Sequence, residues 1–208
     1  MDARVQTAAP VDSAASGQWA AALIGHRQTV LPKRLVEPGP DASQLDLIFR
    51  AAAAAPDHGE LLPWRFIVIP AAARARLAQV FAASLLERDP LASAEQCAQA
   101  REKAFRAPTL MLAVVDIGPA TSEIPGCERL LSAGCAIQNM LLLATALGFA
   151  SALTSGKALR SAALEQLFSL RAGEQAVCFL SLGTATRRKP ARLRPEPGRY
   201  ISFLEATP

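Results

Sequence analysis

Short runs of mostly apolar residues recur along the chain and separate longer segments that have a different pattern. Proline, glycine or polar residues bound each run. Runs of this length without strict alternation are typical of strands that are buried on both faces of a sheet. The predicted strands cover residues 65–69, 109–115, 150–153 and 176–182.

The segments between these runs carry apolar residues three or four positions apart, which is the spacing of one helix face. The best marked segment follows Asp41, where Gln44 completes a capping-box pattern, Ile48 and Phe49 share a face, and Pro56 ends the helix. The predicted helices cover residues 19–25, 42–55, 72–88, 93–105, 128–147 and 162–168. This alternation predicts an α+β fold of the three-layer α/β type, with a mixed β-sheet flanked by helices around a long central apolar helix.

The segment at residues 128–147 is apolar almost all round, which is typical of a helix at the centre of a fold or of a dimer. It overlaps a stretch of 27 residues, 130–156, that has no charged side chain. Such a stretch is long enough to cross a membrane. Gln138 and Asn139 lie at its middle, where side-chain amides are costly in lipid. We therefore expect a buried core helix and no membrane span.

The composition agrees with a packed, helix-rich domain. Apolar residues make up 51% of the 208 residues and charged residues 19%, so the chain has ample material for a core. The 43 alanines far outnumber the 8 Phe, 2 Trp and 1 Tyr, which favours packed helices over an all-β sandwich. We expect residues 1–17, which show no period, to be a disordered lead and residues 18–208 to form a single domain.

The positive charge of the chain is concentrated near its C-terminus. The formal net charge is +4, and residues 187–199 hold six basic residues and one acid, which is +5, so the rest carries −1. A charged surface, an anion site and a nucleic-acid contact are all compatible with this stretch. It lacks the interleaved aromatic residues of nucleic-acid binders, which makes that last interpretation the weakest.

The four cysteines, Cys97, Cys127, Cys135 and Cys178, include no C-x-x-C pair, and the chain has two histidines. This spacing matches no zinc site, so we expect no bound metal. A chain of this length needs no disulfide bonds to fold, which favours reduced thiols in a cytoplasmic protein. The N-terminus also lacks the basic and apolar regions of a secretory signal.

The common signatures of nucleotide-binding proteins, hydrolases and zinc enzymes, G-x-G-x-x-G, G-x-S-x-G and H-E-x-x-H, are absent from the sequence. Three polar segments remain as candidate sites: residues 26–28, residues 56–60 and the basic stretch at 187–199. Each also has a structural explanation, because a helix end, a capped turn and a solvated surface have the same composition.

The order of these segments resembles that of the flavin-dependent nitroreductase family. Residues 24–69 contain I-G-H-R-Q and then A-P-D-H-G-E-L-L-P-W-R-F-I-V-I, and they are most similar to the small branch whose second helix ends in A-P-D-H before P-W. Residues 132–149 resemble the central helix of the family and its glycine-terminated end. Residues 179–184 resemble the strand and turn before its phosphate-side basic residue.

The resemblance implies a site for FMN. In the family, the R-R-S segment after the first helix holds the phosphate and ribityl chain, and here it reads His26-Arg27-Gln28. His58 matches the A-P-D-H histidine, which reaches FMN from the other subunit. The implied cofactor-binding residues are His26, Arg27, Gln28, His58, Pro63, Trp64, Leu153, Thr154, Ser155, Gly156 and Arg192, with Arg194 as the close alternative to Arg192 at the phosphate.

Four positions depart from the pattern of the family. His26 replaces an arginine of the R-R-S segment, although a histidine can still donate a hydrogen bond to phosphate. Gln28 replaces a hydroxyl group with an amide, Leu62 stands where a glutamine usually contacts the flavin, and Ala54 stands where a partner-subunit arginine is often found. These changes remove polar contacts and affect the affinity for FMN more than the fold. Arg27 and Arg192 keep two guanidinium groups, which bind phosphate without titrating.

The resemblance implies a homodimeric oxidoreductase with FMN at the subunit interface. FMN would take a hydride at N5 from NADH or NADPH and reduce nitro compounds or quinone-like acceptors by a ping-pong mechanism. No catalytic residue is expected, because the cofactor carries the chemistry. One alternative is a flavin-binding or flavin-sequestering protein with little turnover, and the other is a nucleic-acid binder. We expect neither nucleic acid nor a membrane as a partner.

Overall fold

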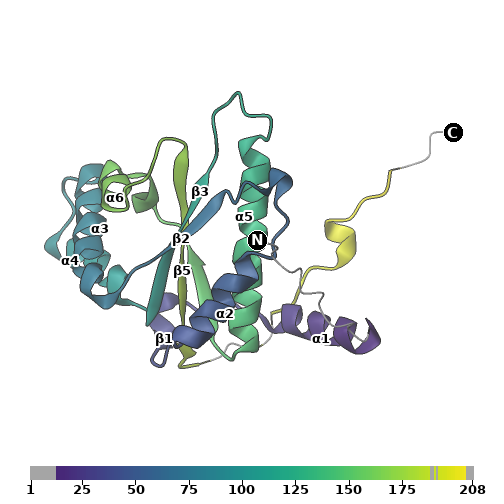
Figure 1. Ribbon diagram of the computed structural model, residues 1–208. Helices are drawn as coiled ribbons and strands as arrows, with labels where there is room; N and C mark the ends of the chain where they lie inside the picture. Colours follow the sequence, from purple (N-terminus) through teal and green to yellow (C-terminus); the bar gives the residue numbers. More distant parts are fainter. Residues whose placement is uncertain (1–12, 188–189, 191, 205–208) are drawn as a thin grey trace.

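Figure 1 shows the computed structural model of the protein, which describes residues 13–187, 190 and 192–204. A central β-sheet is covered by helices on both faces. The strands are β1 (Leu35–Val36), β2 (Trp64–Val68), β3 (Thr109–Asp116), β4 (Ala150–Thr154) and β5 (Glu174–Ala185). The α-helices are α1 (Ser13–His26), α2 (Ala42–Ala52), α3 (Arg74–Arg88), α4 (Ala94–Glu102), α5 (Gly126–Ala146) and α6 (Ala162–Leu167). The 3-10 helices are η1 (Pro32–Arg34), η2 (His58–Glu60), η3 (Ala71–Ala73), η4 (Lys103–Phe105), η5 (Lys157–Arg160) and η6 (Pro197–Arg199).

The β5 strand connects most of the sheet. It pairs with β3 along one edge and with β4 along the other, and β1 pairs with its last two residues. The β2 strand pairs with β3 and forms the opposite edge. These strand pairs are antiparallel, and the parallel component of the sheet is a bridge between Thr29 and Ser151. The predicted fold class is confirmed.

The β3 strand is buried on both faces, which explains its unbroken run of apolar residues. Met111 and Ala113 belong to the core cluster beneath α2 and α5. Leu110 and Leu112 point the other way, into the cluster beneath α3 and α6. Successive side chains of a strand alternate between faces, so a strand covered on both sides has no polar positions.

The α5 helix packs against α2 and the sheet. It buries a stripe of small and apolar side chains, but Leu130 and Leu131 remain exposed. In the described part of the chain, α5 is the one helix long and apolar enough to cross a membrane. Its packing matches the predicted core helix. The buried stripe consists of Ala133, Ala136, Ile137, Met140, Leu141 and Ala144.

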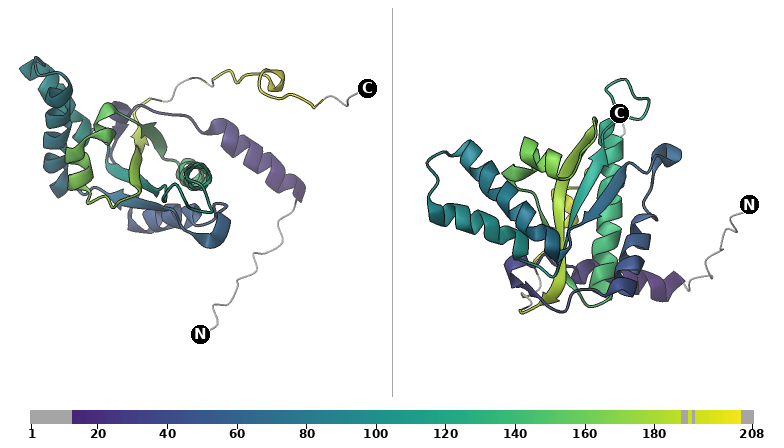
Figure 2. Two further views of the ribbon diagram at one scale, coloured as in Figure 1. Left: turned by 90° about the horizontal axis from the view of Figure 1, so that it is seen from above. Right: turned by 60° about the vertical axis from the view of Figure 1, so that its left-hand side comes forward.

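The N-terminal helix begins earlier than predicted. α1 starts at Ser13, so the expectation of disorder is wrong for residues 13–17, and residues 1–12 lie outside the described residues. Two alanines among these residues favour extension of the helix once its later turns have formed. Figure 2 shows that α1 and residues 192–204 both project from the body of the domain. Both expose large apolar side chains, including Trp19 and Phe203.

Capping boxes fix the starts of two helices. At α2, Asp41 Oδ1 accepts a 2.8 Å hydrogen bond from Gln44 N, and Gln44 Oε1 accepts one of 3.0 Å from Asp41 N. This confirms the predicted capping box. Ser93 and Gln96 form a second one at α4. The α4 helix therefore has a defined start, and it leads directly into η4 and then β3.

Candidate functional site

The segment that follows α1 lies along β4. Val30 N donates a 2.9 Å hydrogen bond to Ser151 O, next to the parallel bridge between Thr29 and Ser151. The two segments run in the same direction and end at the same side of the sheet. The structure thus places two predicted groups of site residues along one strand, with residues 26–28 beside the start of β4 and residues 153–156 at its end.

Arg27 meets the C-terminal segment of the chain. Arg194 Nη2 donates a 3.2 Å hydrogen bond to the main-chain oxygen of Arg27. The guanidinium group of Arg194 is therefore held beside residues 26–28. Arg192, the first choice for the phosphate contact, is an exposed residue of the same segment. His26 lies at the end of α1, with its Nδ1 3.2 Å from the main-chain oxygen of Ala22.

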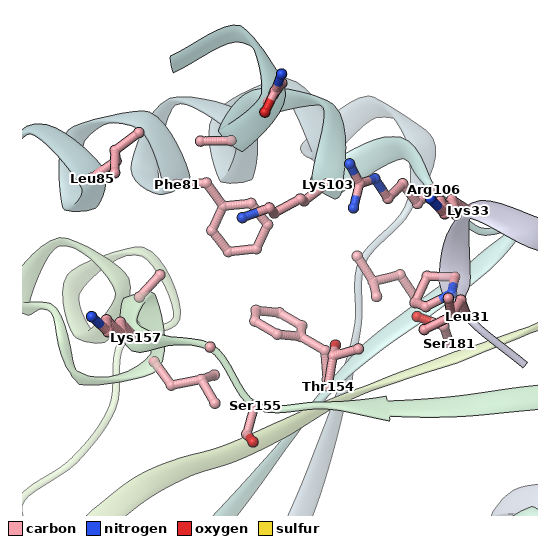
Figure 3. Close-up of a pocket in the computed structure, with 18 of the residues that line it drawn as sticks. Leu31, Lys33, Phe81, Leu85, Lys103, Arg106, Thr154, Ser155, Lys157 and Ser181 are labelled. Atoms are coloured by element: carbon pink, nitrogen blue, oxygen red, sulfur yellow. The ribbon is translucent and has the colours of Figure 1, made fainter. Parts of the chain in front are cut away.

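A cavity of about 620 Å³ opens where β4 ends (Figure 3). Residues 154–156 form one wall, and Leu31 lies at an edge. Its apolar side includes Phe81 and Phe179, whose rings meet edge to face with centres 5.6 Å apart. Leu153 does not line the cavity, because neighbouring residues of a strand face opposite sides. Cavities with apolar walls and a few polar groups are typical ligand sites.

Basic side chains surround this cavity. Figure 3 shows Lys103 over its middle, Lys157 at one side, and Arg106 and Lys33 at the other. Arg88 also lines it, and none of its described lining residues is acidic. These basic residues could not be predicted as a group, because they come from four separate segments of the sequence. The sequence offers one signal for this group of cations. Lys103 and Arg106 lie three positions apart, just before the predicted buried strand at residues 109–115.

Arg74 holds the turn that carries Lys103 and Arg106. Its side chain is buried, with the residue only 6% exposed. Its guanidinium group donates four hydrogen bonds of 2.7–3.2 Å, three to main-chain oxygens of residues 104–108 and one to that of Ile69, and burial lowers its pKa. Because arginine stays charged even so, Arg74 anchors the wall of the cavity. The acceptors are Ile69, Ala104, Ala107 and Pro108.

His58 lies away from the cavity of its own chain. Its Nδ1 is 2.7 Å from Glu128 Oε2, near the start of α5. Glu60 and Leu62 in the same loop have φ angles of 51° and 47°, in the left-handed region that non-glycine residues rarely adopt. Asp57 Oδ2 stabilises the loop by accepting a 2.7 Å hydrogen bond from Leu62 N. Strained loops of this kind are enriched at binding sites.

Pro63 and Trp64 are buried in the domain. Trp64 is 7% exposed and belongs to the core cluster beneath α5. The main-chain oxygen of Pro63 accepts a 2.8 Å hydrogen bond from Asp116 N. Neither residue lines the cavity described above. The structure therefore does not join His58, Pro63 and Trp64 to the other predicted site residues of the same chain, and their roles stay predictions.

The site has no evident metal ligands. Within the residues that the structure describes, no group of three or more His, Cys, Asp or Glu side chains could hold a metal ion. The four cysteines are free. Burial raises the pKa of the Cys178 thiol to about 11, so this thiol is protonated at neutral pH and is a poor nucleophile.

Two relatives share extended sequence similarity with this chain. A Haemophilus influenzae protein named "Putative NAD(P)H nitroreductase" is 36% identical over 173 residues, which cover 83% of this chain and 93% of that protein. An Escherichia coli K12 protein named "Putative NAD(P)H nitroreductase YdjA" is 34% identical over 175 residues, which cover 82% of this chain and 92% of that protein.

Solved structures share the fold. A nitroreductase-like family protein from Bacillus cereus superposes with a TM-score of 0.78 and 19% identity, covering 89% of this chain and 96% of that chain. A nitroreductase with bound FMN from Desulfitobacterium hafniense gives a TM-score of 0.63 and 21% identity, covering 89% and 97%. A family model described as Nitroreductase family matches residues 33–184, which span β1 to β5 except for the last residue of β5. The chain belongs to the nitroreductase family.

Proposed function

We propose that the protein is an NAD(P)H oxidoreductase that uses FMN to reduce nitro compounds or quinone-like acceptors. The observation that carries the proposal is the arrangement along β4, with two arginines beside its start and a cavity at its end. Ser155 lies four residues beyond Ser151, or roughly 13 Å along an extended chain. A phosphate, a five-carbon ribityl chain and a flat ring require this kind of elongated site.

The phosphate end of the site fits FMN. Arg27 and Arg194 would hold the phosphate, because guanidinium groups bind a dianion through paired hydrogen bonds and keep their charge. Arg192, which the family resemblance gives as the first choice for this contact, is only two positions from Arg194 and stays a prediction. The side chains of His26 and Gln28 can donate hydrogen bonds to the phosphate or the ribityl hydroxyl groups.

The cavity end of the site fits the flavin ring. Phe81 and Phe179 supply an apolar side, and the small residues 154–156 allow close approach to their main chain. Lys103, which points over the middle of the cavity, supplies positive charge and a donor for the carbonyl-bearing edge of the ring.

Bound FMN would supply the relay of a hydride between two substrates. Reduction of a nitro group to a nitroso group takes two electrons and two protons and releases one water, while one NAD(P)H is oxidised to NAD(P)⁺. Because the described cavity lining contains no carboxylate, we assign the additional proton to solvent. The task of the chain is to orient the donor and the acceptor in turn on one open face, which gives ping-pong kinetics.

We also infer a homodimer with FMN at the subunit interface. Leu130, Leu131 and Cys127 of α5 line an open, largely apolar cavity of about 670 Å³. α1 and the C-terminal segment project from the domain with exposed apolar side chains. Such surfaces mark interfaces, and stable homodimers bury on the order of 2,000 Å² or more. His58, near the start of α5, would then reach the FMN of the second subunit.

We place the protein in the cytoplasm. Its cysteines are free, and Cys127 is exposed, which suits a reducing compartment. Fractionation of cells that express the tagged protein tests this location.

The alternative function is flavin binding with little turnover. It is favoured by Gln28, which replaces a hydroxyl group of the family pattern, and by Leu62 and Ala54, which are exposed apolar residues where polar flavin contacts were expected. Absorption spectra of the purified protein test both functions. Flavin bands that NADH or NADPH bleaches, and that a nitro compound or quinone restores under anaerobic conditions, support the oxidoreductase. Flavin bands that neither donor bleaches support the alternative, and absence of flavin binding overturns both.

A further inference from the structure

The cavity carries more positive charge than the cofactor requires. The phosphate of FMN is assigned to Arg27 and Arg194 at the other end of β4, and the oxidised flavin ring is uncharged. Lys103 is sufficient for the carbonyl-bearing edge of the ring. Lys33 and Arg106 lie on the side of the cavity away from Lys157, and Arg106 is paired with Glu102. Arg88 and Lys157 remain as basic lining residues without a role in holding FMN.

Arg88 and Lys157 stand at the entrance of the cavity. Arg88 is the last residue of α3, and Lys157 is the first residue of η5. Both line the 620 Å³ cavity and an adjoining open cavity of about 1,180 Å³, together with Ser155 and Gly156. A molecule that enters from the adjoining cavity toward the wall at residues 155–156 passes these two cations.

Neither Arg88 nor Lys157 forms an ion pair within the described part of the chain. By contrast, Arg65 pairs with Glu174, a residue that lines the adjoining cavity. Three glutamates line the adjoining cavity. Of these, Glu174 is held by Arg65 through two hydrogen bonds of 2.7 Å. Glu87 precedes Arg88 in α3, and adjacent helical residues point in different directions. Glu165 and Arg160 complete the charged lining of the adjoining cavity. Because none of the described lining residues of the 620 Å³ cavity is acidic, the charge that Arg88 and Lys157 present to that cavity is positive.

We propose that Arg88 and Lys157 bind the carboxylate of a planar acceptor, so that the enzyme selects anionic acceptors over neutral ones. This inference rests on the proposed function and adds its substrate class. Stacking on a flavin alone discriminates weakly between flat acceptors. A carboxylate that meets two unpaired cations gains charge-assisted hydrogen bonds that a neutral analogue lacks. NADH or NADPH, the electron donor, is also an anion, and it meets the same two cations in the half-reaction that reduces the flavin.

Two acceptors of equal shape test the proposal: 4-nitrobenzoate and its neutral analogue 4-nitrobenzamide. The measured quantity is the ratio of their kcat/KM values, which in ping-pong kinetics is independent of the donor half-reaction. Comparing this ratio between variants cancels the difference in intrinsic reactivity. We expect it to fall about two- to fivefold in Arg88→Gln and in Lys157→Gln, and further in the double variant. High salt lowers the ratio of the unmodified enzyme but not that of the double variant.

Arg160→Gln is the matched control. Arg160 belongs to the same 3-10 helix as Lys157 and has the same charge, but it lines only the adjoining cavity. An unchanged ratio in both test variants, or an equal fall in Arg160→Gln, overturns the proposal. Absence of turnover with every acceptor instead overturns the proposed function. The two benzoic acid derivatives are then titrated calorimetrically into the protein as purified, and equal Kd values for both overturn the substrate class.

Discussion

The guanidinium group of Arg194 donates a hydrogen bond to the main-chain oxygen of Arg27, which joins positions 167 residues apart in the sequence. The contact brings basic side chains from both ends of the domain to the start of β4. Thr29, two residues after Arg27, is bridged to that strand at Ser151. The site at the start of β4 therefore depends on contacts between the two ends of the domain.

Alanine substitutions of the arginines should separate their contributions to cofactor binding. Arg27→Ala and Arg194→Ala should each weaken FMN binding by about 1.5–3 kcal/mol, the range for a hydrogen bond to a charged group. Arg192→Ala should have a smaller effect, because Arg194 is the residue that contacts Arg27. Quenching of FMN fluorescence on titration with protein measures the three Kd values. A larger loss in Arg192→Ala than in Arg194→Ala would assign the phosphate to Arg192.

Removal of the buried guanidinium group should destabilise the domain. Arg74→Met leaves four main-chain oxygens without their donor, which should lower the free energy of unfolding by about 3 kcal/mol or more. Urea unfolding measures the change. Arg76→Met is the control, since Arg76 lies on the same helix but is exposed. Equal effects of the two substitutions would contradict the anchoring role of Arg74.

A charge on the exposed face of α5 should break the dimer. Leu131 is 68% exposed in the single chain, so Leu131→Glu costs little in the monomer but places a carboxylate in the inferred interface. Light scattering should show a 22.0 kDa monomer, with loss of bound flavin. Leu91→Glu, at an exposed position between α3 and α4, should leave the dimer intact. A flavin-bound monomer of the unmodified protein would remove the interface from the proposal.

The His58–Glu128 pair should contribute more to flavin retention than to stability. Both side chains are exposed, so His58→Ala should change the stability of flavin-free protein by no more than about 1 kcal/mol. The same variant should lose FMN more readily if His58 contacts the cofactor of the second subunit. Thermal melts of flavin-free protein and dialysis of the loaded protein provide the two measurements. A large drop in Tm without flavin would make His58 a structural residue.

The buried Cys178 thiol should make stability depend on alkaline pH. Its pKa is about 11 in the folded chain against an ordinary value of 9.0. Below about pH 9 both states hold the proton. Between about pH 9 and 11 only the unfolded state releases it, so the unfolding free energy should fall by about 1.4 kcal/mol per pH unit from this group. Comparison with Cys178→Ala isolates the effect, because that variant lacks the thiol. Parallel pH profiles of the two proteins would contradict the prediction.

Local patterns were sufficient for most of the fold. The strand at residues 109–115 could be predicted because burial on two faces leaves an unbroken apolar run, and the start of α2 could be predicted because Asp41 and Gln44 form a capping box. The start of α1 was missed, since residues 13–17 have weak local signals. The exact start of a helix is difficult to find from local patterns alone.

The candidate site was only partly accessible from the sequence. Arg27 and residues 153–156 could be identified through a family resemblance, and the structure joins them along β4. The basic side chains of the cavity could not be identified from the sequence. Each of them is an ordinary surface residue in its own segment: Lys33, Arg88, Lys103 and Lys157. Only tertiary packing, including the buried Arg74, brings them around one cavity.

The position of β5 determines when the domain can fold during its synthesis. Of the strands that the structure describes, β5 is the last to leave the ribosome, yet β1, β3 and β4 all pair with it. Until residues 174–185 have emerged, β3 has β2 as its one partner strand among those described, and its other edge is open to pairing with other chains. In a nascent chain, one edge of the apolar strand β3 therefore stays unpaired until nearly the whole domain has been made. Chains truncated before β5 should then be substrates for chaperones and proteases rather than smaller folded domains.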